Sequence, residues 1–231
     1  MTRRLTRREW LGVIGGAGLA ACDPAQPKRG ALGVVERVNE RLESLLLSGH
    51  EPTAGPLSPP GAFPSYHVAP VVPVIPDDWR LIVSGKVARP LSLTLDEIRA
   101  LPRTDVRIRH HCVEGWSAVA DWTGVRIAEL AKLAGARDVP YVEVRSFDIP
   151  RDGARGYWSS WDRASALHPH TMLAWAMNGQ PLTPASGAPV RLYGSVKLGY
   201  KMVKYVTEVN FLEVRTGGYW EDQGYEWFAG V

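Results

Sequence analysis

The stretch TDVRIRHHC, residues 104–112, alternates in polarity and predicts a β-strand. Alternation sorts its side chains onto two faces: Val106, Ile108, His110 and Cys112 on one, and Arg107, Arg109 and His111 on the other. The residues that follow, VEGW at 113–116, contain a glycine and break the alternation. Cys112 is therefore predicted to lie where a strand gives way to a loop, a position at which proteins often place functional side chains.

Outward from this stretch, most other segments also have the composition of strands. Runs rich in branched and aromatic residues occupy 79–87, 140–147, 189–194 and 202–214. Asn178-Gly179 between two apolar runs predicts a tight hairpin.

Short helices are predicted at two places. Residues 96–101 follow a capping box formed by Thr94 and Glu97, and residues 123–134 are ended by Gly135. Because strands and helices do not alternate regularly, the chain is predicted to be a mixed, strand-rich single domain of the α+β class. The aromatic C-terminal tail is expected to pack back on this body.

Residues 1–21 have the form of an export signal, with basic residues before an apolar run from Trp10 to Ala21. Arg7 and Arg8 resemble a twin-arginine signal, which carries folded, cofactor-loaded proteins. The segment LAAC that ends at Cys22 resembles a lipoprotein cleavage box; an ordinary signal with an incidental cysteine is the alternative. We expect a periplasmic protein tethered to the inner membrane by lipid on Cys22.

Residues 22–64 are predicted to form a tether, an amphipathic helix and a proline-rich arm, ahead of the main domain at 65–231. The helix, at 32–47, has its apolar residues near one face: Leu32, Val35, Leu42, Leu45 and Leu46. The formal net charge of the whole chain is +3, and the signal segment alone accounts for it. The basic balance therefore does not indicate a nucleic-acid partner.

Cys112 admits three chemical interpretations from the residues alone. A zinc site is disfavoured because His110, His111 and Cys112 are consecutive on a strand and cannot all face one ion. A catalytic thiol is possible, since L,D-transpeptidases also place a histidine two residues before the cysteine, but Glu114 would disfavour the thiolate. A buried, chemically inert thiol is the third interpretation.

Four segments in order resemble the molybdopterin-binding domain of the sulfite oxidase family. They are WRLIVSGKVARPLSLTLDEIRALP from residue 79, RHHCVEGWS from 109, DWTGVRIAELAKLAG from 121 and SGAPVRLYGSVKLGYKMVK from 186. The nearest branch is the periplasmic one that contains protein methionine sulfoxide reductase catalytic subunits. The resemblance implies that family's fold, an oxidoreductase activity and a molybdenum-molybdopterin cofactor with one pterin per molybdenum, for which a thiolate is a suitable protein ligand.

The resemblance also implies roles for individual residues. Cys112 matches the molybdenum ligand, and Arg191 matches a residue that binds the pterin phosphate through its planar guanidinium. A surface strand arginine is the alternative for Arg191, and a packed loop histidine is the alternative for His67. Cofactor contacts are further implied at Ser65, Tyr66, His67, Ser146, Ser186, Gly199, Tyr200 and Lys201.

Glu114 and Trp116 bear on the substrate, because sulfite-oxidising members gather arginines after the ligand. An acid and an aromatic there disfavour a dianion and suit a neutral S- or N-oxide. We expect reduction of such an oxide by oxygen-atom transfer, with Cys112, Glu114 and His111 as catalytic residues, although His110 also flanks the ligand. Sulfite oxidation is the alternative, kept open by Arg107, Arg109 and Arg155.

The sequence contains no C-x-x-C-H haem motif. Electrons are therefore expected from a separate haem partner, either membrane-bound or soluble. The expected substrate is a small-molecule or protein-bound oxide, and the expected catalytic unit is a monomer. A cell-wall L,D-transpeptidase and a metal-free binding lipoprotein are the alternatives from other functional classes.

Overall fold

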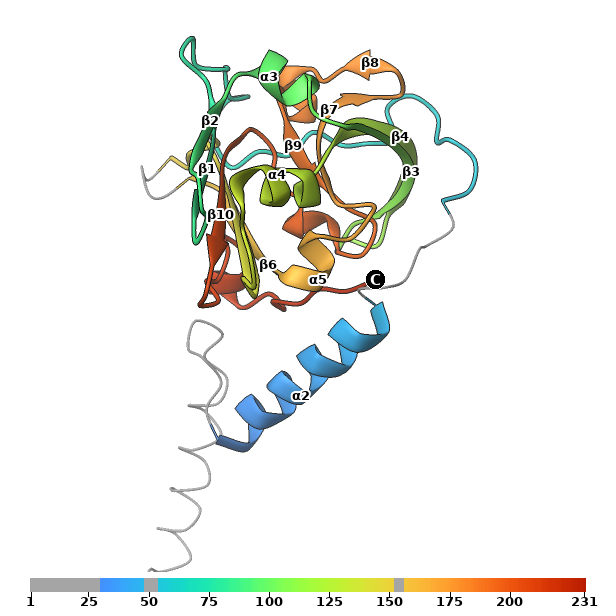
Figure 1. The fold of residues 1–231 in the computed structure, drawn as a ribbon. Coiled ribbons are helices and arrows are strands. Elements are labelled where there is room, and N and C mark those ends of the chain that lie inside the picture. The colour runs from blue at the N-terminus through green and yellow to red at the C-terminus, as the bar shows by residue number, and fades with distance from the viewer. Residues whose placement is uncertain (1–29, 48–53, 152–155) are drawn as a thin grey trace, which may run out of the picture.

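Two five-stranded sheets form the body of the protein within the residues that the computed structural model describes, 30–47, 54–151 and 156–231 (Figure 1). The first sheet has the order β2-β1-β10-β5-β6, with bounds β1 Leu81–Gly85, β2 Leu91–Leu93, β5 Tyr141–Ser146, β6 Trp158–Asp162 and β10 Val206–Leu212. The second has the order β3-β4-β7-β8 with β9 beside β7, and bounds β3 Arg103–His111, β4 Ser117–Arg126, β7 Met172–Met177, β8 Gln180–Pro181 and β9 Arg191–Tyr193. Since β1 and β10 run parallel and most other pairs are antiparallel, the predicted mixed, strand-rich fold is confirmed.

Short helices connect the strands, and one longer helix lies outside the body. The α-helices are α2 Gly30–Leu47, α3 Leu95–Arg99, α4 Ile127–Ala134 and α5 Arg163–Ala166; single 3₁₀ turns are η1 Pro184–Ser186, η2 Gly199–Lys201 and η3 Glu221–Gln223. Figure 1 shows α3 at the top of the body and α2 at the bottom, below both sheets. Among the described residues, no helix has both the length and the apolar character needed to cross a membrane.

The local signals of the sequence are confirmed where one segment determines its own conformation. The side chain of Thr94 accepts from the Glu97 amide, and the Glu97 side chain accepts from the Thr94 amide, so the capping box of α3 is complete. Asn178 and Gly179 have φ of 51° and 76°, which a tight hairpin between β7 and β8 requires.

The predicted helix at 123–134 begins later than expected. Its first residues belong to β4, where Gly124 pairs with Ala174 of β7. A side chain at Gly124 would bring its Cβ within 2.2 Å of the Leu173 carbonyl oxygen, so this close strand pairing needs a glycine. Helix α4 then runs from Ile127 and ends at Gly135 with φ of 69°, as predicted.

Strand β3 has the predicted alternation, with Ile108 and His110 buried. It pairs antiparallel with β4 over its whole length, from Arg103 opposite Val125 to His111 opposite Ser117. The loop between the two strands is tight: the Cys112 amide donates to the Trp116 carbonyl, and the Gly115 amide donates to the Cys112 carbonyl, both at 3.0 Å. Cys112 therefore lies at the start of a hairpin turn, as predicted.

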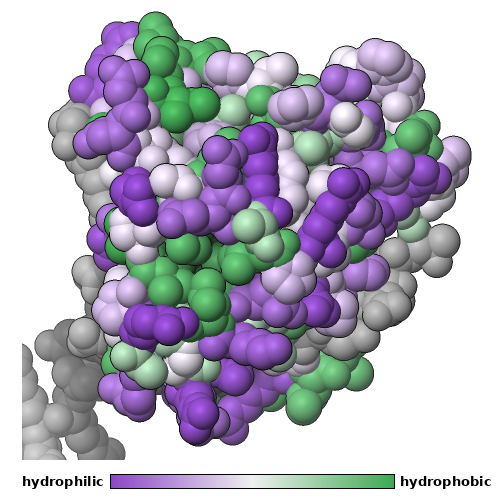
Figure 2. All heavy atoms as spheres, turned by 45° about the horizontal axis from the view of Figure 1, so that its top comes forward, coloured by the Kyte–Doolittle hydropathy of each residue, from purple (hydrophilic) through white to green (hydrophobic). Residues whose placement is uncertain are grey.

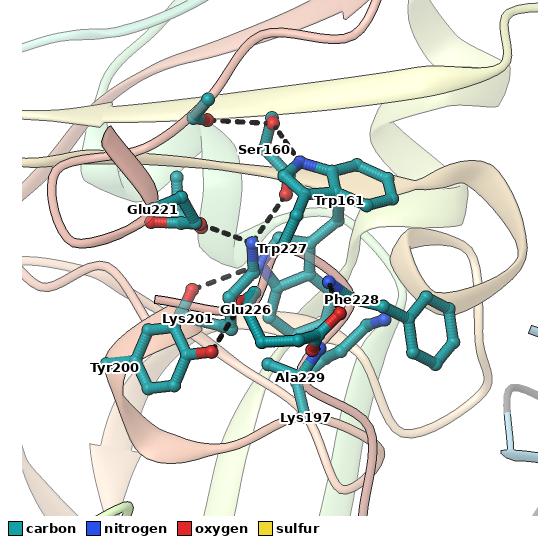
Figure 3. A network of polar contacts seen from close by, with 12 residues as sticks. Ser160, Trp161, Lys197, Tyr200, Lys201, Glu221, Glu226, Trp227, Phe228 and Ala229 are labelled. Carbon is teal, nitrogen blue, oxygen red and sulfur yellow. Dashed lines mark hydrogen bonds and ion pairs between the residues drawn. The ribbon is translucent and has the colours of Figure 1, made fainter. Parts of the chain in front are cut away.

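The aromatic tail packs on the body through Trp227 and Phe228, both buried. Figure 3 shows how polar groups tie this tail down. The ammonium of Lys201 pairs with Glu221 and donates to the Ser160 carbonyl at 2.8 Å. The indole N–H of Trp227 donates to the Ser160 hydroxyl at 2.8 Å. The tail is therefore an integral part of the fold, as predicted.

Several features named from the sequence lie outside the described residues. They are the export signal with Arg7 and Arg8, the lipoprotein motif at Cys22, and Arg155. Helix α2 agrees with the helix predicted at 32–47.

Candidate active site

A cavity of about 440 Å³ opens where the arm, the β3–β4 turn and the segments around η1 and η2 meet. Eleven of the residues singled out for the site line it: Ser65, Tyr66, His67, His110, Cys112, Glu114, Trp116, Ser186, Arg191, Gly199 and Tyr200. They come from four separate parts of the chain, and only the tertiary fold brings them together. The cavity has the size and the few convergent polar groups of a small-molecule site.

Cys112 is partly exposed at this cavity and forms no disulfide. Burial raises the pKa of its thiol, and although two backbone amides oppose this, the Glu114 carboxylate adds to it. The Cys112 Sγ lies 4.0 Å from the Glu114 Oε2. A thiol with a raised pKa is a poor nucleophile but becomes a thiolate when it binds a soft metal. The surroundings therefore favour a metal ligand over a catalytic nucleophile.

Glu114 is held in place by two donors. The Tyr66 hydroxyl donates to its Oε2 at 2.7 Å, and the Trp116 indole N–H donates to the same oxygen at 3.2 Å. Both bonds lower the pKa of the carboxyl. The arm and the hairpin turn are thus joined over the cavity by an ionised carboxylate.

His110, not His111, faces the cavity. The His110 ring stacks on Trp116 with centroids 5.1 Å apart, and its Nδ1 lies 2.9 Å from the Tyr193 hydroxyl. Burial, with a contribution from Arg191, lowers the pKa of His110 to about 3, so the ring is neutral at pH 7. His111 points to the other face of β3 and is absent from the cavity lining. The structure therefore places His110 at the site, which differs from the predicted catalytic role of His111; the side chain of His111 leaves β3 on the opposite face from that of Cys112.

Arg191 and Lys204 give the cavity a cationic end. The Arg191 Nη1 donates to the Ser186 carbonyl at 2.9 Å, and its guanidinium lies 5.2 Å from the Trp122 ring. Within the described residues the Arg191 Nε is buried without a hydrogen-bond partner. Burial and the charge of Arg191 lower the pKa of Lys204 to about 7. A buried donor without an acceptor, beside a second cation, is the arrangement that a phosphate oxygen satisfies.

Gly199 lets the η2 backbone approach the site closely. A Cβ at this position would lie 2.4 Å from the His110 Nε2, so no larger residue fits without displacing that ring. Tyr200 also lines the cavity, and its hydroxyl donates to the Glu226 carbonyl at 2.5 Å. The next residue, Lys201, does not line it. Its side chain is fully buried on the other side of η2 in the pair with Glu221 (Figure 3).

Ser146 is also absent from the cavity lining. Its hydroxyl accepts from the Asp148 amide at 2.8 Å, and the Asp148 carboxylate in turn accepts from the amides of Val68 and Ala69 at 2.9 and 2.8 Å. Ser146 therefore acts on the arm through Asp148. This differs from the predicted cofactor contact, and it arises because the Ser146 hydroxyl is engaged by the amide of Asp148, two residues later in the chain.

The arm residues are held over the cavity by short contacts. The Ser65 hydroxyl donates to the Ala185 carbonyl at 2.9 Å, and the His67 Nδ1 lies 2.7 Å from the Ala69 carbonyl oxygen. His67 therefore packs within its own loop and also lines the cavity, and its predicted cofactor contact stays a prediction.

Several lining residues were not identified from the sequence, among them Asp148, Tyr157, Met202 and Lys204. Lys204 is the last residue of the family-like segment that starts at residue 186, and its cationic side chain was the available signal. The Tyr157 hydroxyl donates to the Tyr200 carbonyl. This contact joins distant segments, so no local sequence pattern predicts it. These residues become visible only once the chain is folded.

The arginines that kept sulfite oxidation open lie elsewhere. Arg107 pairs with Asp121 at 2.7 Å on the exposed face of β3. Arg109 lies against the arm, where its Nη2 would be 2.8 Å from a Cβ on Gly55, and it does not line the cavity. Among the described residues, Arg191 is the arginine of this cavity. Nor do those residues contain a cluster of three or more His, Cys, Asp or Glu side chains able to hold a metal, so Cys112 would be a single protein donor.

The geometry accords with the comparisons to known proteins. A family model described as the oxidoreductase molybdopterin binding domain matches residues 68–220. The chain belongs to this family. Membership confirms the predicted family, the oxidoreductase class and the molybdenum-molybdopterin cofactor at the level of the family. The matched range falls within the domain predicted at 65–231.

Two relatives and one solved structure illustrate the membership. A protein of Azospira oryzae, named a putative protein-methionine-sulfoxide reductase subunit YedZ1, is 44% identical over 153 residues, which cover 66% of this chain and 56% of the relative. The protein-methionine-sulfoxide reductase catalytic subunit MsrP of Xanthomonas campestris is 37% identical over 161 residues, covering 62% of this chain and 48% of the relative. The chain thus spans about half the length of these relatives. The sulfane dehydrogenase SoxCD of Paracoccus pantotrophus has the same fold, with a TM-score of 0.60 and 22% identity over 73% of this chain and 46% of that one.

The residues of the cavity fit the family's cofactor. Cys112 offers a soft thiolate donor, Arg191 and Lys204 offer cations for an anionic phosphate, and Gly199 leaves room for close backbone approach. The Arg191 Nε supplies the buried donor that still lacks an acceptor within the described residues.

Proposed function

We propose that this protein is a molybdopterin-dependent oxidoreductase that reduces an S- or N-oxide by oxygen-atom transfer at the Cys112 cavity. The observation that carries the proposal is that Cys112, Glu114 and Arg191 line one cavity of about 440 Å³. When bound, the molybdenum-molybdopterin supplies two-electron oxygen-atom chemistry, which protein side chains do not perform. The polypeptide binds and orients the reactants.

The side chains divide this work between two ends of the cavity. At the cationic end, Arg191 and Lys204 bind the pterin phosphate through charge-assisted hydrogen bonds. At the other end, Cys112 donates its thiolate to molybdenum, and the neutral His110 stands beside it on Trp116. A neutral imidazole can donate one hydrogen bond to an oxide oxygen without adding charge to the site.

Glu114 sets the substrate class in this proposal. Its ionised carboxylate, fixed by Tyr66 and Trp116, lies 4.0 Å from the Cys112 sulfur. A small dianion such as sulfite would be repelled at this distance, whereas a neutral sulfoxide or amine oxide would not. The names of the two relatives, which mention methionine sulfoxide, favour the same class.

The location and the partners are part of the proposal. Twin-arginine export and lipid on Cys22 would place the enzyme in the periplasm beside the inner membrane, within reach of a membrane-bound haem partner that delivers electrons. The domain at 65–231 would act as a monomer on a small-molecule or protein-bound oxide. The motifs at Arg7, Arg8 and Cys22 support this placement.

Metal and pterin content test the proposal directly. Wild-type protein exported through its native pathway should contain molybdenum and pterin, Cys112→Ser should lose the molybdenum, and the exposed neighbour Ser117→Ala should keep both. The loaded enzyme should then reduce S- or N-oxides with a reduced viologen dye as donor. Absence of molybdenum from the wild type, or undiminished metal in Cys112→Ser, would refute the proposal, and a clear preference for sulfite oxidation would reverse the assigned direction.

A further inference from the structure

Helix α2 presents its hydrophobic side to solvent. Six aliphatic residues are between 50% and 80% exposed: Val34, Val35, Val38, Leu42, Leu45 and Leu46. At about 100° per residue they fall within roughly one third of the helix circumference. Surface helices of globular proteins usually turn such a stripe toward the core. In α2 the orientation is reversed.

The polar side of α2 faces the body instead. The Glu40 carboxylate accepts from Arg215 Nη1 at 2.6 Å, and Gly33 is buried at the contact. Burial raises the pKa of Glu43. At its C-terminal end the Leu47 side chain lies beside Gly230 of the tail. These contacts fix which side of the helix is left outward.

The charged residues of α2 lie on the side toward the body and along the edge of the aliphatic stripe. The three glutamates, Glu36, Glu40 and Glu43, are partly buried toward the body, whereas Arg37 and Arg41 are exposed. Arg37 and Arg41 also line the groove between α2 and the body, so the outward surface of α2 is mainly aliphatic, is flanked along one edge by these two cations and carries no exposed acid among the described residues. The helix also contains no aromatic residue or methionine, two kinds of side chain that protein interfaces favour.

We infer that the outward side of α2 lies on the surface of an anionic phospholipid bilayer. Its valines and leucines would enter the boundary between headgroups and acyl chains, while Arg37 and Arg41 contact lipid phosphates. The inference rests on the proposed tethering at Cys22 only for reach, since the eight residues from Cys22 to Gly30 span at most about 28 Å. The body of the enzyme would then be held against the membrane in one orientation.

Spin labels on the full chain in vesicles of phosphatidylethanolamine and phosphatidylglycerol test this orientation. Labels are attached at Val38→Cys or Leu45→Cys, and at Asp96→Cys as a control; protein without an added cysteine gives the background. Asp96 is 94% exposed on α3, at the opposite end of the body from α2 (Figure 1). Figure 2 brings that end forward and shows hydrophilic and hydrophobic residues mixed over it. The Val38 and Leu45 labels should be accessible to oxygen and protected from a water-soluble nickel complex, and the Asp96 label should show the reverse.

A charged variant provides the second measurement. Leu45→Asp with Leu46→Asp alters side chains that are 80% and 73% exposed, and it should lower the fraction of Val38 label in lipid at least about tenfold. The matched control, Val71→Asp with Val74→Asp, changes two equally exposed valines of the arm and should leave the label in lipid.

The outcomes are distinguishable from failure of the proposed activity. Flotation of the protein with the vesicles reports the tether, and molybdenum content reports the active site; neither determines label accessibility. A Val38 label as accessible to nickel as the Asp96 label would overturn the inference. So would a label shielded from both oxygen and nickel, because that result would show a second copy or another protein covering the helix.

Discussion

Replacing Lys201 separates a structural role from a cofactor contact. Its ammonium is fully buried, pairs with Glu221, whose side chain is 4% exposed, and donates to the Ser160 carbonyl at 2.8 Å. In Lys201→Met the Glu221 carboxylate stays buried without its cation. Breaking a buried pair in this way costs about 3–5 kcal/mol of unfolding free energy. We therefore expect a large loss of stability with little direct effect on the cavity.

Urea unfolding followed by tryptophan fluorescence measures this loss, and the chain has nine tryptophans to report it. The double variant Lys201→Met with Glu221→Gln removes the stranded charge, while the glutamine can still accept from the Ser159 hydroxyl, now 2.7 Å from Glu221. It should recover most of the lost free energy. Folded Lys201→Met protein should still bind molybdenum and pterin. A destabilisation below about 1 kcal/mol together with loss of the cofactor would refute this reasoning and return Lys201 to the cofactor site.

Further predictions concern the cavity itself. His110→Ala should lower oxide reduction at least about tenfold while His111→Ala has little effect, measured as kcat/KM of loaded enzyme. Arg191→Lys should lower pterin content because a lysine cannot replace the guanidinium fork, measured against wild type after identical export. Gly199→Ala should destabilise the fold by about 1–3 kcal/mol in urea, because its Cβ would lie 2.4 Å from His110 Nε2. In cofactor-free protein, Lys204 has a pKa of about 7 against 10.5 for an ordinary lysine, so the unfolded state binds more protons between these values; wild type should gain stability relative to Lys204→Gln as pH rises through this window.

Each of these has a result that would contradict it. Equal losses of kcat/KM in His110→Ala and His111→Ala would contradict the assignment of His110 as the histidine of the site. Unchanged pterin in Arg191→Lys would place the phosphate elsewhere, and a Gly199→Ala protein as stable as wild type would show that His110 can move aside. A pH profile of Lys204→Gln parallel to that of wild type would mean that the Lys204 ammonium is not desolvated.

The sequence predicted correctly those parts of the fold that depend on neighbouring residues. It was less accurate where the conformation depends on contacts with distant parts of the chain. The capping box of α3, the Asn178-Gly179 turn and the end of α4 at Gly135 depend on neighbouring residues, and each is confirmed. The start of α4 was misplaced because Gly124 joins β4 through pairing with β7, some fifty residues later in the chain. Register between distant strands is not encoded in a local pattern.

The candidate site likewise has features that the sequence predicted and features that depend on contacts between distant segments. Strand alternation alone put His110 and Cys112 on one face, and the structure agrees. A family motif indicates which segment approaches a cofactor but not where each side chain points, so Tyr200 lines the cavity and its neighbour Lys201 does not. Asp148 and Lys204 join the site through contacts between distant segments, for which the sequence offers no periodic signal.

The cavity walls have a consequence for when the protein can become active. Ser65 comes from an early part of the described body and Lys204 from a late part, and both line the same cavity. A nascent chain that ends before β9 lacks Arg191, Gly199 and Lys204 together, and one that ends before η2 still lacks Gly199 and Lys204. No partial product of synthesis has a complete binding site. The cofactor can therefore bind only after the whole domain has been synthesised and folded, so a protein that contains cofactor is a complete, folded one.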